Sequence, residues 1–249
     1  MRASWLLILL ASLGALAAAS SLDEQKRRDA EKAYRRGEEL ARAESFEEAA
    51  SYFRQAIKLD PLLSIAYYSL GQTQMALRRY PAAIEAYQGC RQSFERIAAL
   101  DVGDRNALEK ARQDEIRELR DSLVRVQQGK IKGATLSQEM GIEERLKVLE
   151  GAQMKGNDER GGVPAEVMLA LGSAYFRNGQ LPEAEPAYKE AVATDAKLGP
   201  AYSNLAVIYM MTSRFADAKD AVKRAEKAGF PINPALKKEI DQREKAAAK

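Results

Sequence analysis

The sequence predicts an all-α protein built from repeated helical hairpins. Small and aromatic residues recur at a spacing of 34 residues, as in the pairs Gly37–Gly71, Ala49–Ala83, Phe53–Tyr87, Gly172–Ala206 and Ala184–Ala218. Small residues are needed where two antiparallel helices approach closely, and aromatic side chains fill the space against the next hairpin. The composition agrees, because 30% charged and 7% aromatic residues suit exposed helix faces better than a thick β-sandwich core.

The first 19 residues are typical of a secretory signal peptide. Arg2 supplies the positive start, an apolar run follows from Trp5, and residues 17–19 are alanines that form a small-residue cleavage site. We expect cleavage after Ala19, with Ser20 as the second choice, and therefore a mature chain that is exported, periplasmic or extracellular. The alternative is a membrane anchor formed by an uncleaved N-terminal helix, because the uncharged stretch reaches about the 20 residues that a membrane span needs.

Residues 30–97 hold the first two repeats. The first ends in Ala56–Pro61, and the second begins at Ser64 and carries Ala66–Gly71 in its first helix. Pro81 stands in the first turn of the second helix of this hairpin, where a missing backbone N–H costs nothing.

Residues 165–232 hold two further repeats with the same pattern. The third carries Leu171–Tyr175 and Leu181–Ala184, and the fourth carries Ala201–Ala206 and Phe215–Ala218. Four matching units make the periodicity a specific signal rather than a chance spacing.

These four units resemble the tetratricopeptide repeat family, whose unit is a helix–turn–helix of 34 residues. The resemblance implies a right-handed α-solenoid of such hairpins. It also implies that the first helix of each unit lines a concave groove that binds a protein or peptide partner.

Residues 98–164 do not match the repeat. We expect an atypical central helical pair here, over residues 104–128 and 137–153, followed by a flexible loop at 156–162. The first helix of the pair has an apolar stripe of Leu108, Ala111, Ile116, Leu119, Leu123 and Val126. Its spacing permits a coiled-coil seam. The stripe therefore either packs on neighbouring helices of the same chain or joins two copies in a homodimer.

Residues 233–249 are predicted to form a C-terminal capping helix. Asn233 is a suitable N-cap and Pro234 occupies the first helical position. Leu236 and Ile240 share one face, and charged residues cover the rest. The open end of a stacked array requires such a polar-backed helix.

The composition excludes most catalytic sites. The chain has no histidine, which removes Ser-His-Asp and Cys-His pairs and imidazole metal sites, and Cys90 is its single cysteine. The stretch Gly156–Gly162 lacks the Lys and the Ser or Thr of a phosphate loop. The net charge is +3 with both signs interspersed, which provides no basic face for nucleic acid. We therefore expect no enzyme activity, cofactor, metal ion or nucleic-acid partner.

By the resemblance, outward positions of the four first helices form the partner-binding groove. These positions hold Tyr34, Arg35, Glu38, Arg42, Tyr68, Ser69, Gln72, Met75, Leu169, Ser173, Phe176, Arg177, Ser203, Asn204, Val207, Met210 and Met211. A well-known subgroup clamps the C-terminal carboxylate of chaperone tails with Lys, Arg and Asn. Only Arg35 and Asn204 are of a suitable type at those places, and they lie in units at opposite ends of the array. Chaperone-tail binding is therefore disfavoured.

The sequence thus predicts a non-catalytic protein–protein interaction scaffold of the cell envelope or secretory space, which binds a partner segment in the groove. The alternative is a self-associating structural assembly subunit that uses the 104–128 helix. A membrane takes part only through an uncleaved N-terminal segment.

Overall fold

The computed structural model describes residues 25–100, 102–128, 142, 146 and 162–247. The predicted signal peptide, most of the predicted helix over 137–153 and nearly all of the predicted loop at 156–162 lie outside these residues. Every regular element in the described part of the chain is a helix, as the sequence predicts. None of these helices has a stretch long and apolar enough to cross a membrane.

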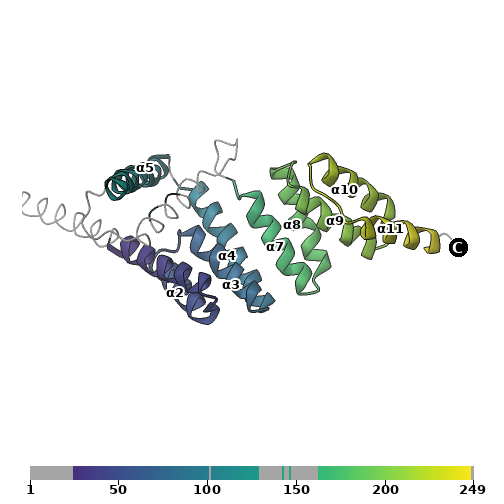
Figure 1. Cartoon of the computed structure of the whole chain (residues 1–249), viewed down its shortest axis with the longest axis horizontal. Helices are drawn as coiled ribbons and strands as arrows, with labels where there is room; N and C mark the ends of the chain where they lie inside the picture. The colour runs from purple at the N-terminus through teal and green to yellow at the C-terminus, as the bar shows by residue number, and fades with distance from the viewer. Residues whose placement is uncertain (1–24, 101, 129–141, 143–145, 147–161, 248–249) are drawn as a thin grey trace, which may run out of the picture. The chain divides into compact units, whose positions relative to one another are not determined.

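The chain divides into two units. The first combines Met1–Phe94 with Val163–Lys249, and the second is Glu95–Gly162. Within the described residues of the first unit, the first helical stretch covers residues 25–42. Its remaining helices are α2 (Phe46–Leu59), α3 (Ser64–Ala76), α4 (Tyr80–Ala98), α7 (Ala165–Arg177), α8 (Leu181–Thr194), α9 (Gly199–Met211), α10 (Phe215–Lys227) and α11 (Pro234–Ala247) (Figure 1).

Each hairpin turn contains one residue with a left-handed backbone at the same position of the repeat. These residues are Glu44, Arg78, Gly179 and Ser213, with φ angles of 57°, 56°, 78° and 59°. The N–H of the following residue donates to the carbonyl five positions earlier at 2.8 or 2.9 Å, which ends the first helix and reverses the chain. Only the third repeat has glycine at this position, and the other three side chains cost roughly 1 kcal/mol each.

A short aspartate turn joins one hairpin to the next. Asp60 follows α2 directly, and its Oδ1 accepts the N–H of Leu62 at 2.9 Å. Asp195 follows α8 directly, and its Oδ1 accepts the N–H of Lys197 at 2.8 Å. Side chains of this type stabilise tight turns by bonding to the backbone two residues further on. The connection from α4 to α7 differs, because it carries the second unit, Glu95–Gly162.

The two helices of a hairpin meet where a glycine faces an aromatic ring. Three repeats make this contact, through the pairs Gly37–Phe53, Gly71–Tyr87 and Gly172–Tyr188. A Cβ placed on Gly172 would lie 2.7 Å from the ring of Tyr188, closer than real Cβ atoms come to a neighbour. In the fourth repeat both partners differ, since Ala206 stands at the glycine position and Val222 at the aromatic position. Because valine is smaller than tyrosine, Val222 leaves room for the methyl group of Ala206.

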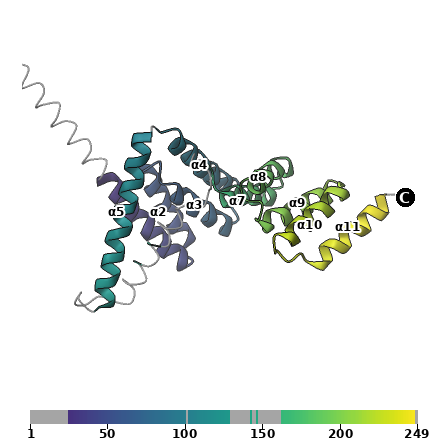
Figure 2. The ribbon, with the colours of Figure 1, turned by 90° about the horizontal axis from the view of Figure 1, so that it is seen from above.

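The hydrophobic core runs through the second, third and fourth repeats without interruption. Tyr87 of α4 belongs to the same buried cluster as Met168 and Leu171 of α7. Gln88 Nε2 of α4 donates to the hydroxyl of Tyr175 at 2.7 Å. Both views show α4 and α7 side by side (Figures 1 and 2). The third repeat therefore stacks directly on the second, although the second unit separates them in the sequence.

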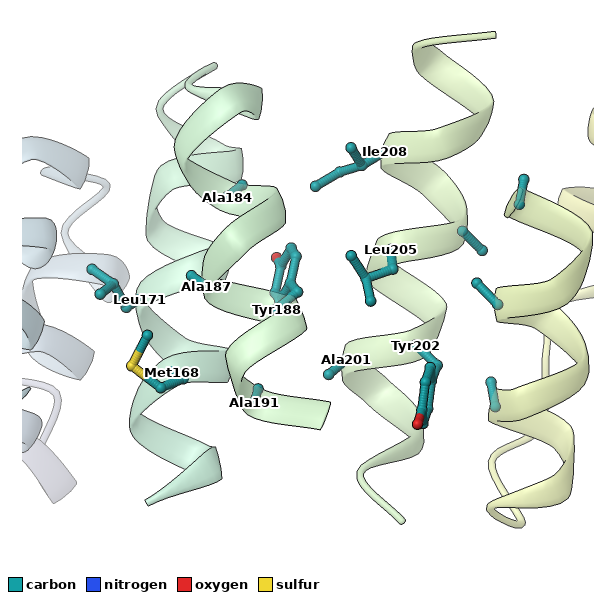
Figure 3. Packing of buried hydrophobic residues seen from close by; sticks show 14 of the residues in the cluster. Met168, Leu171, Ala184, Ala187, Tyr188, Ala191, Ala201, Tyr202, Leu205 and Ile208 are labelled. Carbon is teal, nitrogen blue, oxygen red and sulfur yellow. The ribbon is translucent and has the colours of Figure 1, made fainter. Parts of the chain in front are cut away.

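The third and fourth repeats meet through α8 and α9. Tyr188, Leu205 and Ile208 are buried and lie between these two helices (Figure 3). Alanines of α8 allow the close approach: Ala184 and Ala191 have no exposed surface. Close packing of this kind excludes water from the repeat interface and supplies most of its stability.

The last helix, α11, packs on the fourth repeat. Ile240 is completely buried, and it stands one repeat length after Ala206, where earlier repeats have glycine. No second helix of a fifth hairpin follows in the described residues, so the larger side chain has room. Lys219 of α10 pairs with Asp241 at 3.0 Å and with Glu244 at 2.5 Å, which ties α11 to the preceding hairpin.

The second unit contains α5 (Val102–Gln127), which corresponds to the helix predicted over 104–128. Of the helix predicted over 137–153, residues 142 and 146 are described, and both are helical. Ile116 of α5 and Leu146 are buried together, and Leu119, Leu123 and Ile142 pack against them. Part of the apolar stripe of α5 is therefore covered within its own unit.

Candidate partner-binding surface

The first helices of the four repeats, residues 25–42, α3, α7 and α9, carry the side chains that the sequence predicts to bind a partner. We call their exposed and half-buried side chains the first-helix surface. Of the predicted residues, Arg35, Arg42, Gln72, Arg177 and Met211 are exposed. Those that are half-buried are Glu38, Tyr68, Met75, Leu169, Ser173, Phe176, Ser203, Asn204 and Val207.

Three of the predicted residues lie in the core instead. Tyr34 is 3% exposed, because its ring packs on Phe53 with the two ring centres 5.7 Å apart. Ser69 is buried in α3, and Met210 belongs to the same buried cluster as the α8–α9 interface. These side chains are covered by neighbouring helices, so a partner does not reach them.

Apolar side chains of the first-helix surface form rows across neighbouring repeats. Tyr68 and Leu169 occupy one repeat position on α3 and α7, and Met75 and Phe176 occupy another. All four are half-buried and pack against the core cluster from outside. Met211 extends the apolar character on α9 and is 48% exposed. Half-exposed apolar side chains on a rigid helix provide contact area that needs little ordering when a partner binds.

Tyr68 is held as a neutral phenol. Burial raises its pKa, and the negative charge of Glu166 on α7 acts in the same direction. A hydrogen bond from Gln72 opposes the shift. Its ring lies 5.7 Å from that of Tyr87, which fixes the orientation of the hydroxyl group. Tyr68 is thus a preorganised hydrogen-bond donor and acceptor beside apolar neighbours.

A polar group from three helices surrounds the hydroxyl of Tyr188. The hydroxyl donates to Ser173 Oγ at 3.2 Å, and Ser173 Oγ donates to the carbonyl of Leu169 at 2.8 Å. Burial raises the pKa of Tyr188, and Ser173, the positive charge of Arg177 and the side chain of Asn204 on α9 partly oppose the rise. Ser173 is therefore fixed in position on the first-helix surface.

A charged cluster joins the third and fourth repeats, and sequence reasoning missed it. Arg214 donates to both carboxylate oxygens of Glu185, with Nη1 3.0 Å from Oε1. Lys189 Nζ lies 2.7 Å from Glu185 Oε1, and the guanidinium of Arg214 lies 4.4 Å from the ring centre of Tyr209. The hydrogen bond from Arg214 is the largest cause that lowers the pKa of Glu185 to about 2.

The first two repeats contain a related pair. Arg79 occupies the repeat position of Arg214, and it donates from Nη1 to Glu47 Oε2 at 2.8 Å. In both cases an arginine before the second helix of one repeat reaches back to a glutamate on the second helix of the preceding repeat. The recurrence of arginine at this position was the signal in the sequence that could have revealed the pairing.

The thiol of Cys90 is placed for packing rather than for chemistry. It is 1% exposed, and its Sγ lies 3.3 Å from the carbonyl oxygen of Ser64, to which it donates. Burial raises the pKa of Cys90 to about 12, so the reactive thiolate is scarce at neutral pH. The described residues contain no cluster of acidic, Cys or His side chains suited to a metal ion.

The sequence model of the tetratricopeptide repeat matches residues 34–93, 160–199 and 169–234, which together exceed half of the chain. The chain belongs to the tetratricopeptide repeat family. The matched segments cover most of the four hairpins of the first unit and leave out α5. The prediction of an all-α solenoid of tetratricopeptide repeat hairpins is confirmed.

Solved structures of tetratricopeptide repeat proteins resemble the chain at low sequence identity. YrrB, described as a TPR protein with an unusual peptide-binding site, is 18% identical with a TM-score of 0.27, over 84% of this chain and 91% of its own. PilW, a widely conserved type IV pilus biogenesis factor, is 16% identical with a TM-score of 0.39, over 86% and 85%. PilF of Pseudomonas aeruginosa is 18% identical with a TM-score of 0.30, over 89% of each chain. A comparison with curated proteins finds no match.

Proposed function

We propose that this tetratricopeptide repeat protein is a non-catalytic interaction scaffold that binds a protein or peptide segment along its first-helix surface. The observation that carries the proposal is the set of apolar side chains left half-buried or exposed on adjacent first helices. Tyr68 and Leu169 share one repeat position, Met75 and Phe176 share another, and Met211 is exposed on α9. Membership of the tetratricopeptide repeat family supports it, because stacked helical hairpins present extended binding surfaces.

Binding requires little rearrangement of the chain in this mechanism. The rings behind the surface, Tyr87 and Tyr188, are buried, and the continuous core holds α7 and α9 in place. The ordering cost of association then falls mainly on the partner segment. Apolar contact supplies the affinity, at about 25 cal/mol for each Å² of apolar surface removed from water.

We also propose that the mature chain acts outside the cytoplasm, in the cell envelope or the secretory space. Support comes from the N-terminal sequence, where an apolar run follows Arg2 and ends in small residues. Mass spectrometry of the protein from its native cells tests this step. Cleavage after Ala19 gives Ser20 as the first residue. An intact N-terminus in a membrane fraction would instead support the anchored form.

The alternative function, self-association through α5, has one observation in its favour. Val124 of α5 is 48% exposed, the same fraction as Met211. Against it, Ile116, Leu119 and Leu123 of the same helix already pack with Leu146 inside their own unit. The interaction scaffold is therefore the better supported function.

A crosslinking pull-down from native cells distinguishes these two functions. Wild type is compared with Met211→Glu on the first-helix surface and with Val124→Glu on α5, a matched change at an equally exposed apolar residue. The scaffold predicts that partners are lost with Met211→Glu and retained with Val124→Glu. Partners that survive Met211→Glu and disappear with Val124→Glu would favour assembly through α5 and contradict our proposal.

A further inference from the structure

The part of the first-helix surface on α7 and α9 combines an exposed arginine with half-exposed polar side chains and an exposed apolar side chain. Arg177 lies four residues after Ser173 on α7, so both side chains point from the same face of the helix. Arg177 is exposed and forms no ion pair with any acidic side chain of the described residues. Other arginines of the array, such as Arg79 and Arg214, are paired with glutamates.

The positive charge of Arg177 acts on the polar group around Tyr188. Its field stabilises the negatively charged form of the Tyr188 hydroxyl, which opposes the effect of burial on the pKa. Ser173 is hydrogen-bonded to that hydroxyl, and the side chains of Ser173 and of Asn204 on α9 are both half-exposed. A partner that reaches Arg177 therefore also meets a hydroxyl group that is held in position by a buried ring.

An apolar side chain, Met211, stands at the equivalent repeat position on the next first helix. Met211 occupies on α9 the repeat position that Arg177 occupies on α7, and α9 contacts α7. It is 48% exposed, and the half-buried Val207 lies one turn before it. A cation and an exposed thioether therefore stand on neighbouring helices. A partner segment that is complementary to this arrangement carries a negative group together with a nearby apolar group.

We infer that the partner segment is an extended acidic peptide whose Asp or Glu carboxylate pairs with Arg177 while an adjacent apolar side chain contacts Met211 and Val207. This inference rests on the proposed function and specifies the chemistry of its partner. Arginine suits the role because its guanidinium binds a carboxylate through two parallel hydrogen bonds. A polynucleotide is a poorer match, because the net charge is +3 and acidic residues are interspersed with basic ones.

The test uses the whole chain without its predicted signal peptide. Peptides that bind to it are selected from a random library of unstructured peptides. Selected peptides are expected to be enriched in Asp or Glu next to an apolar residue. A selected peptide should lose about tenfold in affinity with Arg177→Glu, which corresponds to the loss of one charge-assisted contact at a solvated site. Arg177→Lys should weaken binding less than Arg177→Glu does, because lysine keeps the charge but loses the paired hydrogen bonds. Raising the salt concentration should weaken the binding of wild type.

A charge swap gives the sharper readout. Replacing the acidic residue of the peptide by Arg should restore binding to Arg177→Glu while weakening binding to wild type. The control variant is Lys223→Glu on α10, an exposed residue away from the first helices, and it should leave affinity unchanged. Fluorescence anisotropy of the labelled peptide measures all of these affinities.

Failure of the inference and failure of the proposed function give different results. Peptides that lose affinity with Met211→Glu but not with Arg177→Glu, or that carry no acidic enrichment, overturn the acidic specificity and leave the interaction scaffold standing. Peptides that are indifferent to both substitutions overturn the first-helix surface as the binding site, and the inference fails with it.

Discussion

The glycine–aromatic contact inside each hairpin allows a quantitative test of the packing argument. Replacing glycine by alanine within a helix ordinarily stabilises it by about 1 kcal/mol. At Gly172 the new methyl carbon would lie 2.7 Å from the ring of Tyr188. Overpacking of this kind costs about 1–3 kcal/mol. We therefore expect Gly172→Ala to lower the free energy of unfolding by about 1 kcal/mol, opposite in sign to the usual result.

The fourth repeat indicates how the clash is relieved. Ala206 and Val222 occupy the positions of Gly172 and Tyr188 there, so the double variant Gly172→Ala/Tyr188→Val converts the third repeat to the same pairing. Tyr188→Val alone should cost about 3 kcal/mol, because it removes a ring from a buried site. In the double variant the methyl group occupies part of that space. The double variant should therefore lose less free energy of unfolding than the two single variants together, by about 1–2 kcal/mol.

Urea unfolding, monitored by far-UV circular dichroism, measures these differences. The comparison requires the slope of unfolding free energy against urea concentration to be the same in all variants. Ala206→Gly is the control, and it should destabilise by about 1–2 kcal/mol, because it loses helix propensity and removes a buried methyl group. A stabilising Gly172→Ala, or single effects that add within about 0.5 kcal/mol in the double variant, would refute the reasoning.

Three further predictions concern stability. Glu185→Gln should cost about 1 kcal/mol at pH 7, since the ion pair with Arg214 is partly solvated. The pKa of Glu185 falls from 4.5 to about 2 on folding, so this difference in unfolding free energy, measured by urea titration, should persist above pH 4.5 and disappear as the pH falls through about 2. Gln74→Leu should raise the urea midpoint by an amount equivalent to about 1–2 kcal/mol, because the buried Gln74 Oε1 has no hydrogen-bond partner among the described residues; a lowered midpoint would contradict this. Replacing residues 94–164 by Asp-Ala-Lys-Leu, the turn found between α8 and α9, should leave a helical array with one cooperative transition, whereas loss of helical signal by circular dichroism would show that the array needs its second unit.

The hairpins could be predicted from the sequence because the contacts that define them are local. Gly172 and Tyr188 face each other within one repeat, and their spacing is repeated elsewhere in the chain. The left-handed turn residues are harder to predict from the sequence. Gly179 is of the residue type that favours this conformation, but Arg78 and Ser213 adopt it as well. In those repeats the hydrogen bonds of the turn impose a conformation that the residue type does not favour.

Exposure and pairing between repeats were harder to predict. Tyr34 and Met210 occupy outward positions in the repeat pattern, yet neighbouring helices bury them. Whether such a side chain is covered depends on the size of its neighbours in three dimensions, which the periodicity does not encode. The pair of Arg214 and Glu185 joins residues from two repeats, so no local spacing identifies it. Arg177 is exposed at its outward position in the repeat pattern, but only the structure shows that no acidic side chain among the described residues pairs with it.

The long connection between α4 and α7 affects how the array holds together. In a stacked array, consecutive hairpins that pack on each other are normally joined by about four residues. The hairpins that meet through α4 and α7 are joined by about seventy residues. Loop-closure entropy scales as (3/2)RT ln n, so the longer connection weakens the coupling across this joint by up to roughly 2.5 kcal/mol. The protein is thus expected to behave as two blocks of two repeats, and the joint between them should separate before either block unfolds.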